Sequence, residues 1–112
     1  MELITAFVAI VSIVDLRLQF VILDGQAVVL THQEYRLLAL LVQHRGEIVP
    51  RAILLARVFG YAPEARTRTL DNHIRRLRKK LGREGRRIET IVRKGYRYIS
   101  GNLPEADTRT KL

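Results

Sequence analysis

The sequence predicts an α+β domain in which an N-terminal antiparallel sheet is followed by three helices and a C-terminal β-hairpin. Alternating apolar residues lead into Asp24-Gly25, three later segments carry apolar residues at helical spacing, and two short alternating segments flank residues 93–95. The 112 residues suffice for one domain, over residues 1–100, and are too few for two. We expect residues 101–112, which are mostly polar, to form a disordered tail.

The sheet is predicted over residues 1–30. Residues 3–14 are rich in β-branched side chains, which favours a buried strand. Apolar residues then stand at every second position from Leu16 to Ile22, as is typical of a strand. Asp24-Gly25 supplies a hairpin turn before a further strand over residues 26–30.

The three helices are predicted over residues 31–82. Thr31 and Glu34 have the spacing of a capping box, and Leu30 can pack onto Tyr35 as a hydrophobic staple. The first helix ends where Gly46 allows the chain to leave it. Its core-facing stripe consists of Leu37, Leu38, Leu41 and Val42.

A second helix is predicted over residues 51–59, closing at Gly60. We expect Ile53, Leu54 and Val58 to be its buried side chains.

The third helix, capped by Thr67 and ending near Gly82, has one narrow apolar stripe at spacings of four, three and four. The stripe consists of Leu70, Ile74, Leu77 and Leu81. At about 100° per residue, a polar and largely cationic face lies opposite. That face carries Arg68, Asn72, Arg75, Arg76 and Lys79, with His73, Arg78 and Lys80 on its flanks.

The C-terminal hairpin is predicted over residues 87–99, with strands at 88–92 and 96–99. Its turn is Arg93-Lys94-Gly95, where we expect Gly95 to supply a positive φ. We expect Tyr96 and Tyr98 to pack in the core rather than to stack on bases.

Charge is concentrated in one third of the chain. Residues 66–97 hold thirteen Lys and Arg against three Asp and Glu, whereas the remaining residues hold seven against eight. Sixteen of the twenty cations are Arg, whose guanidinium donates hydrogen bonds in pairs to phosphates and base edges. A polyanionic partner is therefore indicated.

Several other classes of protein are not expected. The absence of cysteine excludes disulfides, thiol catalysis and cysteine-ligated zinc. His32, His44 and His73 lack the spacing of metal ligands, and no nucleophile, base and orienting group occur together, so we expect neither a metal, a cofactor nor an enzyme. The longest uncharged apolar run, residues 3–14, is too short to span a bilayer, and no cationic secretion signal precedes it. We expect a cytoplasmic protein with no membrane contact.

The order of the elements itself predicts a function. The second and third helices form a helix-turn-helix, and the hairpin forms a wing beside it. The major groove of DNA, about 12 Å wide, admits one helix with donors for base edges, while the minor groove admits Arg or Lys on a thin β-tip. A winged helix-turn-helix that reads double-stranded DNA is therefore predicted.

Residues 30–98 resemble the C-terminal effector domain of the OmpR/PhoB-type winged-helix transcription regulators. The resemblance is carried by residues 30–38 (LTHQEYRLL), 58–61 (VFGY), 68–82 (RTLDNHIRRLRKKLG) and 95–98 (GYRY). It implies a sequence-specific regulator of the two-component, phosphorelay response-regulator kind that binds tandem sites as a dimer. It also implies contact of loop 60–66 with RNA polymerase, for which a plain connector is the alternative.

The resemblance also assigns individual residues. With the recognition helix, residues 68–81, in the major groove, Asn72 and Arg76 match base-facing positions. With the wing, residues 92–97, at the minor groove, the expected wing contacts are Thr90, Arg93, Lys94 and Arg97. The expected phosphate-contacting or groove-lining residues are Arg68, Thr69, His73, Arg75, Arg78, Lys79 and Lys80.

The chain departs from this family at three places. The usual wing reads Arg-Gly-any-Gly-Tyr-Arg, whereas residues 92–97 read VRKGYR, as in ToxR/CadC-type regulators. Pro50 replaces the usual Ser N-cap of the second helix, which weakens the start of that helix by about 1 kcal/mol. The short spacing from Leu16 to Gly25 suggests three N-terminal strands instead of four.

Other roles remain open from the residues alone. An RNA-binding or ribosome-associated basic protein is the main alternative function, and a pure protein-interaction module is a third. We expect Asp71 to pair with Arg75 on the helix surface, with base contact as the alternative.

Overall fold

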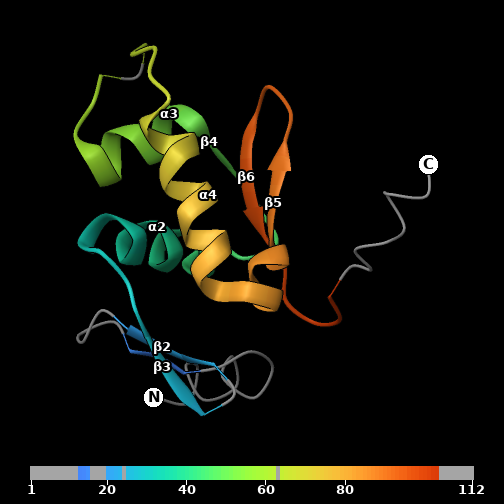
Figure 1. The fold of residues 1–112 in the computed structure, drawn as a ribbon. Coiled ribbons are helices and arrows are strands. Elements are labelled where there is room, and N and C mark those ends of the chain that lie inside the picture. Colours follow the sequence, from blue (N-terminus) through green and yellow to red (C-terminus); the bar gives the residue numbers. More distant parts are fainter. Residues whose placement is uncertain (1–12, 16–19, 24, 63, 104–112) are drawn as a thin grey trace.

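The computed structural model describes residues 13–15, 20–23, 25–62 and 64–103, and it confirms the predicted α+β fold (Figure 1). The strands predicted within residues 3–12 and 16–19, and the tail beyond residue 103, lie outside these residues. Two short three-stranded sheets flank the helices. The elements are β1 (Ile13–Asp15), β2 (Phe20–Leu23), β3 (Gln26–Val29), α2 (His32–Gln43), β4 (Ile48–Pro50), α3 (Arg51–Leu54), the π-helical η1 (Leu55–Phe59), α4 (Thr69–Leu81), the 3-10 helix η2 (Gly82–Arg87), β5 (Ile88–Ile91) and β6 (Gly95–Tyr98).

The N-terminal sheet has the antiparallel order β1-β2-β3, so the part of the chain that the structure describes has the three strands expected there. Val21 is the buried residue of β2, only 1% exposed, whereas Ile22 is half-buried. Residues 20–23 are all apolar, so periodicity could not decide which face packs on the core.

Helix α2 begins and ends as its sequence predicts. The Thr31 Oγ1 accepts from the Glu34 N–H at 3.2 Å, and the Thr31 N–H donates to Glu34 Oε1 at 2.9 Å. Leu30 and Tyr35, the expected staple, are both buried. Three of the four predicted stripe residues are buried, and the fourth packs against the core: Leu37, Leu38, Leu41 and Val42.

The second helix spans α3 and η1 and ends at Gly60, whose φ of 73° confirms the predicted stop. Leu54 and Val58 are buried as expected, but Ile53 is 43% exposed, so its prediction as a core residue was wrong. Leu55 is buried instead. A buried face centred between Leu54 and Leu55 leaves Ile53 about 150° away around the helix.

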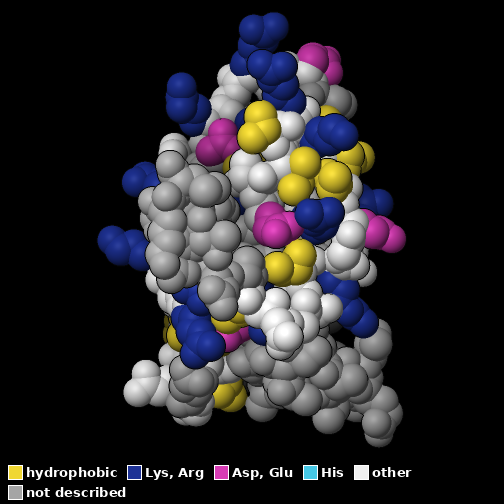
Figure 2. Space-filling view, turned by 90° about the vertical axis from the view of Figure 1, so that its right-hand side faces the viewer, with side chains coloured by type: hydrophobic (Ala, Val, Ile, Leu, Met, Phe, Trp, Pro, Cys, Tyr) yellow, Lys and Arg dark blue, Asp and Glu magenta, His cyan; other side chains and the backbone are white. Residues whose placement is uncertain are grey.

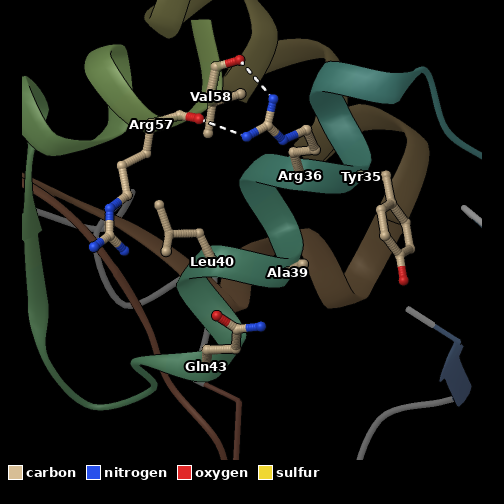
Figure 3. Close-up of a pocket in the computed structure, with 7 residues that line it drawn as sticks. All are labelled: Tyr35, Arg36, Ala39, Leu40, Gln43, Arg57 and Val58. Carbon is tan, nitrogen blue, oxygen red and sulfur yellow. Dashed lines mark hydrogen bonds between the residues drawn. The ribbon is translucent and has the colours of Figure 1, made fainter. Parts of the chain in front are cut away.

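Arg36 of α2 holds the C-terminal end of this second helix. Its guanidinium donates to the carbonyl of Arg57 at 2.6 Å and to that of Val58 at 3.4 Å (Figure 3). A cation at the last carbonyls of a helix satisfies their free acceptors and opposes the negative end of the helix dipole. The two helices are thereby fixed beside an open groove of about 350 Å³.

Strand β4 was not predicted, and it changes the interpretation of the hairpin. It pairs with β6 to give a second sheet of order β4-β6-β5, with Pro50 opposite Gly95. A Cβ on Gly95 would lie 2.0 Å from the Val49 carbonyl oxygen. Gly95 therefore permits a close approach of two backbones, and the positive φ expected there occurs at Arg93, at 65°.

Pro50 is the N-cap of the second helix and forms no side-chain cap hydrogen bond, as predicted. The Arg51 N–H donates instead to the carbonyl of Lys94, at 3.2 Å. The hairpin thus satisfies one of the free amides at this helix start. Of the helices in the described ranges, none is both long and apolar enough to cross a lipid bilayer.

Candidate nucleic-acid interface

The N-cap of helix α4 lies one residue later than predicted. The N-cap residue is Arg68 and not Thr67, although the Thr67 Oγ1 still accepts the Thr69 N–H at 3.1 Å. The Thr67 and Thr69 hydroxyls lie 2.8 Å apart. The start of α4 is therefore ordered by the two threonines on either side of Arg68.

The two faces of α4 are separated as the sequence predicts. The entire apolar stripe is buried: Leu70, Ile74, Leu77 and Leu81. The opposite face is exposed: Arg68, Asn72, Arg75, Arg76 and Lys79. Within the described part of the chain, no hydrogen bond or ion pair engages the side chains of Asn72, Arg75, Arg76 or Lys79. Their donors are available to a partner.

The flanks of α4 are held by contacts within the chain. The His73 Nδ1 lies 2.8 Å from the Thr69 carbonyl oxygen, and its ring packs edge-on against Phe59. The Lys80 Nζ lies 2.8 Å from Glu34 Oε1, and Glu34 is only 1% exposed. Burial raises the pKa of Glu34, but the bonds from Lys80 and Thr31 outweigh it, so its pKa is lowered overall. Glu34 thus both caps α2 and anchors the end of α4.

Arg78 joins α4 to the hairpin. Its Nε and Nη2 donate to the Ile88 carbonyl at 2.9 and 2.7 Å, and Nη2 also donates to Thr90 Oγ1 at 2.8 Å. The guanidinium carbon lies 5.7 Å from the centre of the Tyr96 ring. Two predicted site residues, Arg78 and Thr90, therefore contact each other, a pairing that nothing in the sequence pattern signals.

The hairpin β5–β6, called the wing below, ends in the exposed residues Val92, Arg93 and Lys94. Arg97 is less free, since its Nη2 lies 2.9 Å from Glu89 Oε1. Tyr96 and Tyr98 are buried, which confirms their predicted packing role. Figure 2, which faces the hairpin side, shows Lys and Arg side chains along the upper part and the edges of the molecule, with acidic and hydrophobic side chains between them.

An Arg93→Gly substitution should stabilise the wing. Arg93 has a φ of 65°, a region that costs a residue with a Cβ about 1 kcal/mol or more and costs glycine nothing. We expect the free energy of unfolding to rise by about 1 kcal/mol in urea titrations followed by circular dichroism. Lys94→Gly, which removes the neighbouring charge without relieving a positive φ, is the control. A loss of stability in Arg93→Gly would contradict the left-handed conformation.

Asp71 has a different partner from the one expected. Arg51 Nη1, and not Arg75, lies 2.6 Å from its Oδ1, and the Tyr96 hydroxyl donates to the same oxygen at 2.5 Å. The prediction of a local pair within the helix was wrong because the partners come from helix α3 and strand β6. Over the described ranges, no group of three His, Asp or Glu side chains is placed to hold a metal ion.

Comparisons with known proteins agree with this geometry. Residues 25–98 match the family model described as "Transcriptional regulatory protein, C terminal". The response regulator ArlR of Staphylococcus saprophyticus is 42% identical over 78 residues, which are 68% of this chain and 36% of that protein. The "DNA-binding dual master transcriptional regulator RpaA" of Synechocystis is 40% identical over 75 residues, 64% of this chain and 31% of that protein. The chain thus spans about a third of the length of these relatives.

Solved structures are similar as well. The DNA-binding domain of CpxR from Escherichia coli has a TM-score of 0.74 and 33% identity, and the match covers 81% of this chain and 92% of that one. The Klebsiella pneumoniae RstA DNA-binding domain, solved in complex with the RstA box, has a TM-score of 0.69 and 34% identity over 77% of this chain and 88% of that one. The DNA-binding domain of CadC from Escherichia coli, at 23% identity, shares the fold with a TM-score of 0.67 over 83% of this chain and 87% of that one.

Proposed function

The chain belongs to the family of C-terminal domains of transcriptional regulatory proteins, and on that basis we propose that it binds double-stranded DNA sequence-specifically. This family is one of DNA-binding regulator domains and not a class of enzyme. The observation that carries the proposal is the outward face of α4, whose Asn72, Arg75, Arg76 and Lys79 are exposed and unengaged above a buried stripe. An unengaged row of donors on a single helix fits the major groove.

We assign direct reading of bases to Asn72 and Arg76. Both side chains are exposed and lie one turn apart on α4. Asn can bond adenine through two atoms, and Arg can bond guanine in the same way. The phosphate contacts are assigned to the exposed Arg68, Arg75 and Lys79 and to the partly buried Thr69.

The remaining predicted residues are assigned to the edges of the interface. Three of them line the interface and are also bonded within the chain: His73 to Thr69, Arg78 to the wing, and Lys80 to Glu34. At the wing, the minor-groove contacts are assigned to Arg93 and Lys94 at the exposed tip, and to Thr90 and Arg97, which also bond Arg78 and Glu89.

Regulation, oligomeric state, location and contact with RNA polymerase are proposed from the similarity to the family and not from the geometry of this chain. The name of the response regulator ArlR supports a phosphorelay input for this domain. As the family resemblance implies, we also propose that the domain binds tandem sites as a dimer and acts in the cytoplasm. The loop over residues 60–66, of which the structure describes 60–62 and 64–66 near α3, is the proposed contact with RNA polymerase (Figure 1). Residues 1–100 are proposed as the DNA-binding domain, with 101–112 as its tail.

Selection of duplexes from a random pool, followed by binding titrations, tests the proposal. Arg76→Ala should cost about 1 to 3 kcal/mol of binding free energy and relax the preference at one base position, since it removes a base contact. Lys79→Ala, on the same face, is the matched control and should weaken all duplexes alike. With about five phosphates neutralised, the slope of log K against log salt should lie near −5.

Two outcomes would overturn the proposal. Equal affinity for random and enriched duplexes would remove sequence specificity. Tighter binding of structured RNA than of any duplex would instead favour the RNA-binding alternative.

A further inference from the structure

Three elements of the proposed DNA interface meet at one carboxylate. Asp71 lies in the first turn of α4, Arg51 begins α3, and Tyr96 belongs to β6 of the wing. Asp71 Oδ1 accepts from Arg51 Nη1 at 2.6 Å and from the Tyr96 hydroxyl at 2.5 Å. One oxygen therefore connects both helices of the helix-turn-helix with the wing.

The same residues are connected by a second layer of bonds. Arg51 Nη2 donates to the Thr67 carbonyl at 3.3 Å, just before α4 begins, and the Arg51 N–H donates to the Lys94 carbonyl at 3.2 Å. Arg78 lies over the face of the Tyr96 ring and donates to Thr90. The wing strands are thus fixed to α4 by two of its residues, Asp71 and Arg78.

The charges favour this arrangement at neutral pH. Burial raises the pKa of Asp71, but the bonds from Tyr96 and Arg51 outweigh it and lower its pKa overall. Burial and the Asp71 carboxylate together raise the pKa of Tyr96 to about 12, so the hydroxyl remains a donor. The Asp71 acceptor therefore stays charged while the Tyr96 hydroxyl keeps its proton.

The ion pair contributes little to stability alone. The Arg51 and Asp71 side chains are both more than a third exposed, and exposed ion pairs stabilise folded proteins weakly. Their placement has a more specific consequence. We call the contacts among Arg51, Asp71 and Tyr96 the junction. Asp71 directly precedes Asn72, and Tyr96 lies three residues from Arg93. The junction therefore connects the proposed major-groove contacts with the proposed minor-groove contacts.

We propose that Asp71 is a positioning residue that sets the wing against α4, so that the contacts in the two grooves form together. The inference rests on the proposed function. It predicts that breaking the junction weakens DNA binding by displacing the wing. The displaced wing loses its minor-groove contact, whereas Arg76 retains its contact with a base.

Tyr96→Phe tests this, because it removes one hydroxyl and keeps the buried ring. With the duplex that the chain itself enriches from a random pool, we expect affinity to fall about fivefold, on the scale of one hydrogen bond. In an Arg93→Ala/Lys94→Ala background the same change should cost less than about twofold, since both tip contacts of the wing are already absent. In an Arg76→Ala background it should still cost about fivefold.

Three further variants separate positioning from general destabilisation. Tyr98→Phe removes a buried hydroxyl from the same strand away from Asp71 and should leave affinity unchanged. Asp71→Asn keeps an acceptor for Tyr96 and should retain more affinity than Asp71→Ala. Hydroxyl-radical footprints of Tyr96→Phe should lose minor-groove protection beside the site and keep the rest, and thermal melts should show a folded protein.

The outcomes distinguish the two proposals. If Tyr96→Phe weakens binding equally in all backgrounds, or not at all, Asp71 does not position the wing, although the domain still binds DNA. If the unmodified chain binds no duplex, the proposed function fails and the inference fails with it.

Discussion

Leu77→Ala should lower the free energy of unfolding by about 2 to 5 kcal/mol, because it leaves a cavity where a fully buried leucine packed. Leu77 lies in the middle of the α4 stripe, and α4 contacts α2 and η2. Small domains are stabilised by only about 5 to 15 kcal/mol, so this is a large fraction of the total. Urea titration followed by circular dichroism measures the loss.

Lys79→Ala is the matched control for that substitution. It shortens an exposed side chain two positions further along the same helix and should change stability by no more than about 0.5 kcal/mol. Should Leu77→Ala abolish folding, Leu77→Met preserves most of the volume and is expected to cost less than about 1.5 kcal/mol. Equal effects of the two alanine variants would mean that α4 is rotated from its observed orientation.

The orientation of α4 could be predicted because it depends on local periodicity. A single stripe at spacings of four, three and four leaves one solution for the buried face, and the outward positions of Asn72 and Arg76 follow from it. The capping box at Thr31 and Glu34 is local in the same way. These features involve residues within a few positions of one another, so they could be recognised without knowledge of the tertiary fold.

The features that the sequence did not reveal depend on distant partners. Strand β4 is three residues long and ends in proline, and it exists because β6 pairs with it from nearly fifty positions away. Glu34 was identified as a cap, but its pairing with Lys80 joins residues 46 positions apart. For the same reason, the sequence predicts that Arg78 contacts phosphate or lines the groove, and gives no sign of its bonds to Ile88 and Thr90. The sequence around an Arg or Lys on the flank of a helix does not indicate whether its side chain extends into solvent or bonds another part of the fold.

Gly95 is required by a tertiary contact and not by the local turn that its position in the sequence suggests. A glycine after two cations in a hairpin is typical of a turn that needs a positive φ, and the sequence supports that interpretation. In the structure, Arg93 adopts the positive φ and Gly95 faces the backbone of β4. The two explanations predict different results when a methyl group is added at Gly95.

Gly95→Ala should destabilise the domain by about 3 kcal/mol, the upper end of the usual cost of overpacking. The added Cβ would lie 2.0 Å from the Val49 carbonyl oxygen and 2.9 Å from the Pro50 Cα. Both atoms are backbone, so no side-chain rotation relieves the contact, and β4 must separate from β6. Because the Arg51 N–H bonds Lys94 beside this pair, the separation should also displace the wing and weaken duplex binding.

Gly60→Ala is the control that separates crowding from backbone conformation. Gly60 has a φ of 73° and open space around the position of a Cβ, so alanine there should cost only the conformational strain of about 1 to 2 kcal/mol. Thermal or urea unfolding of the two variants compares the costs directly. If Gly95→Ala proves the milder change, the β4–β6 contact does not form as described. If it is the more severe, then the glycine of the wing is required by the strand that packs against it.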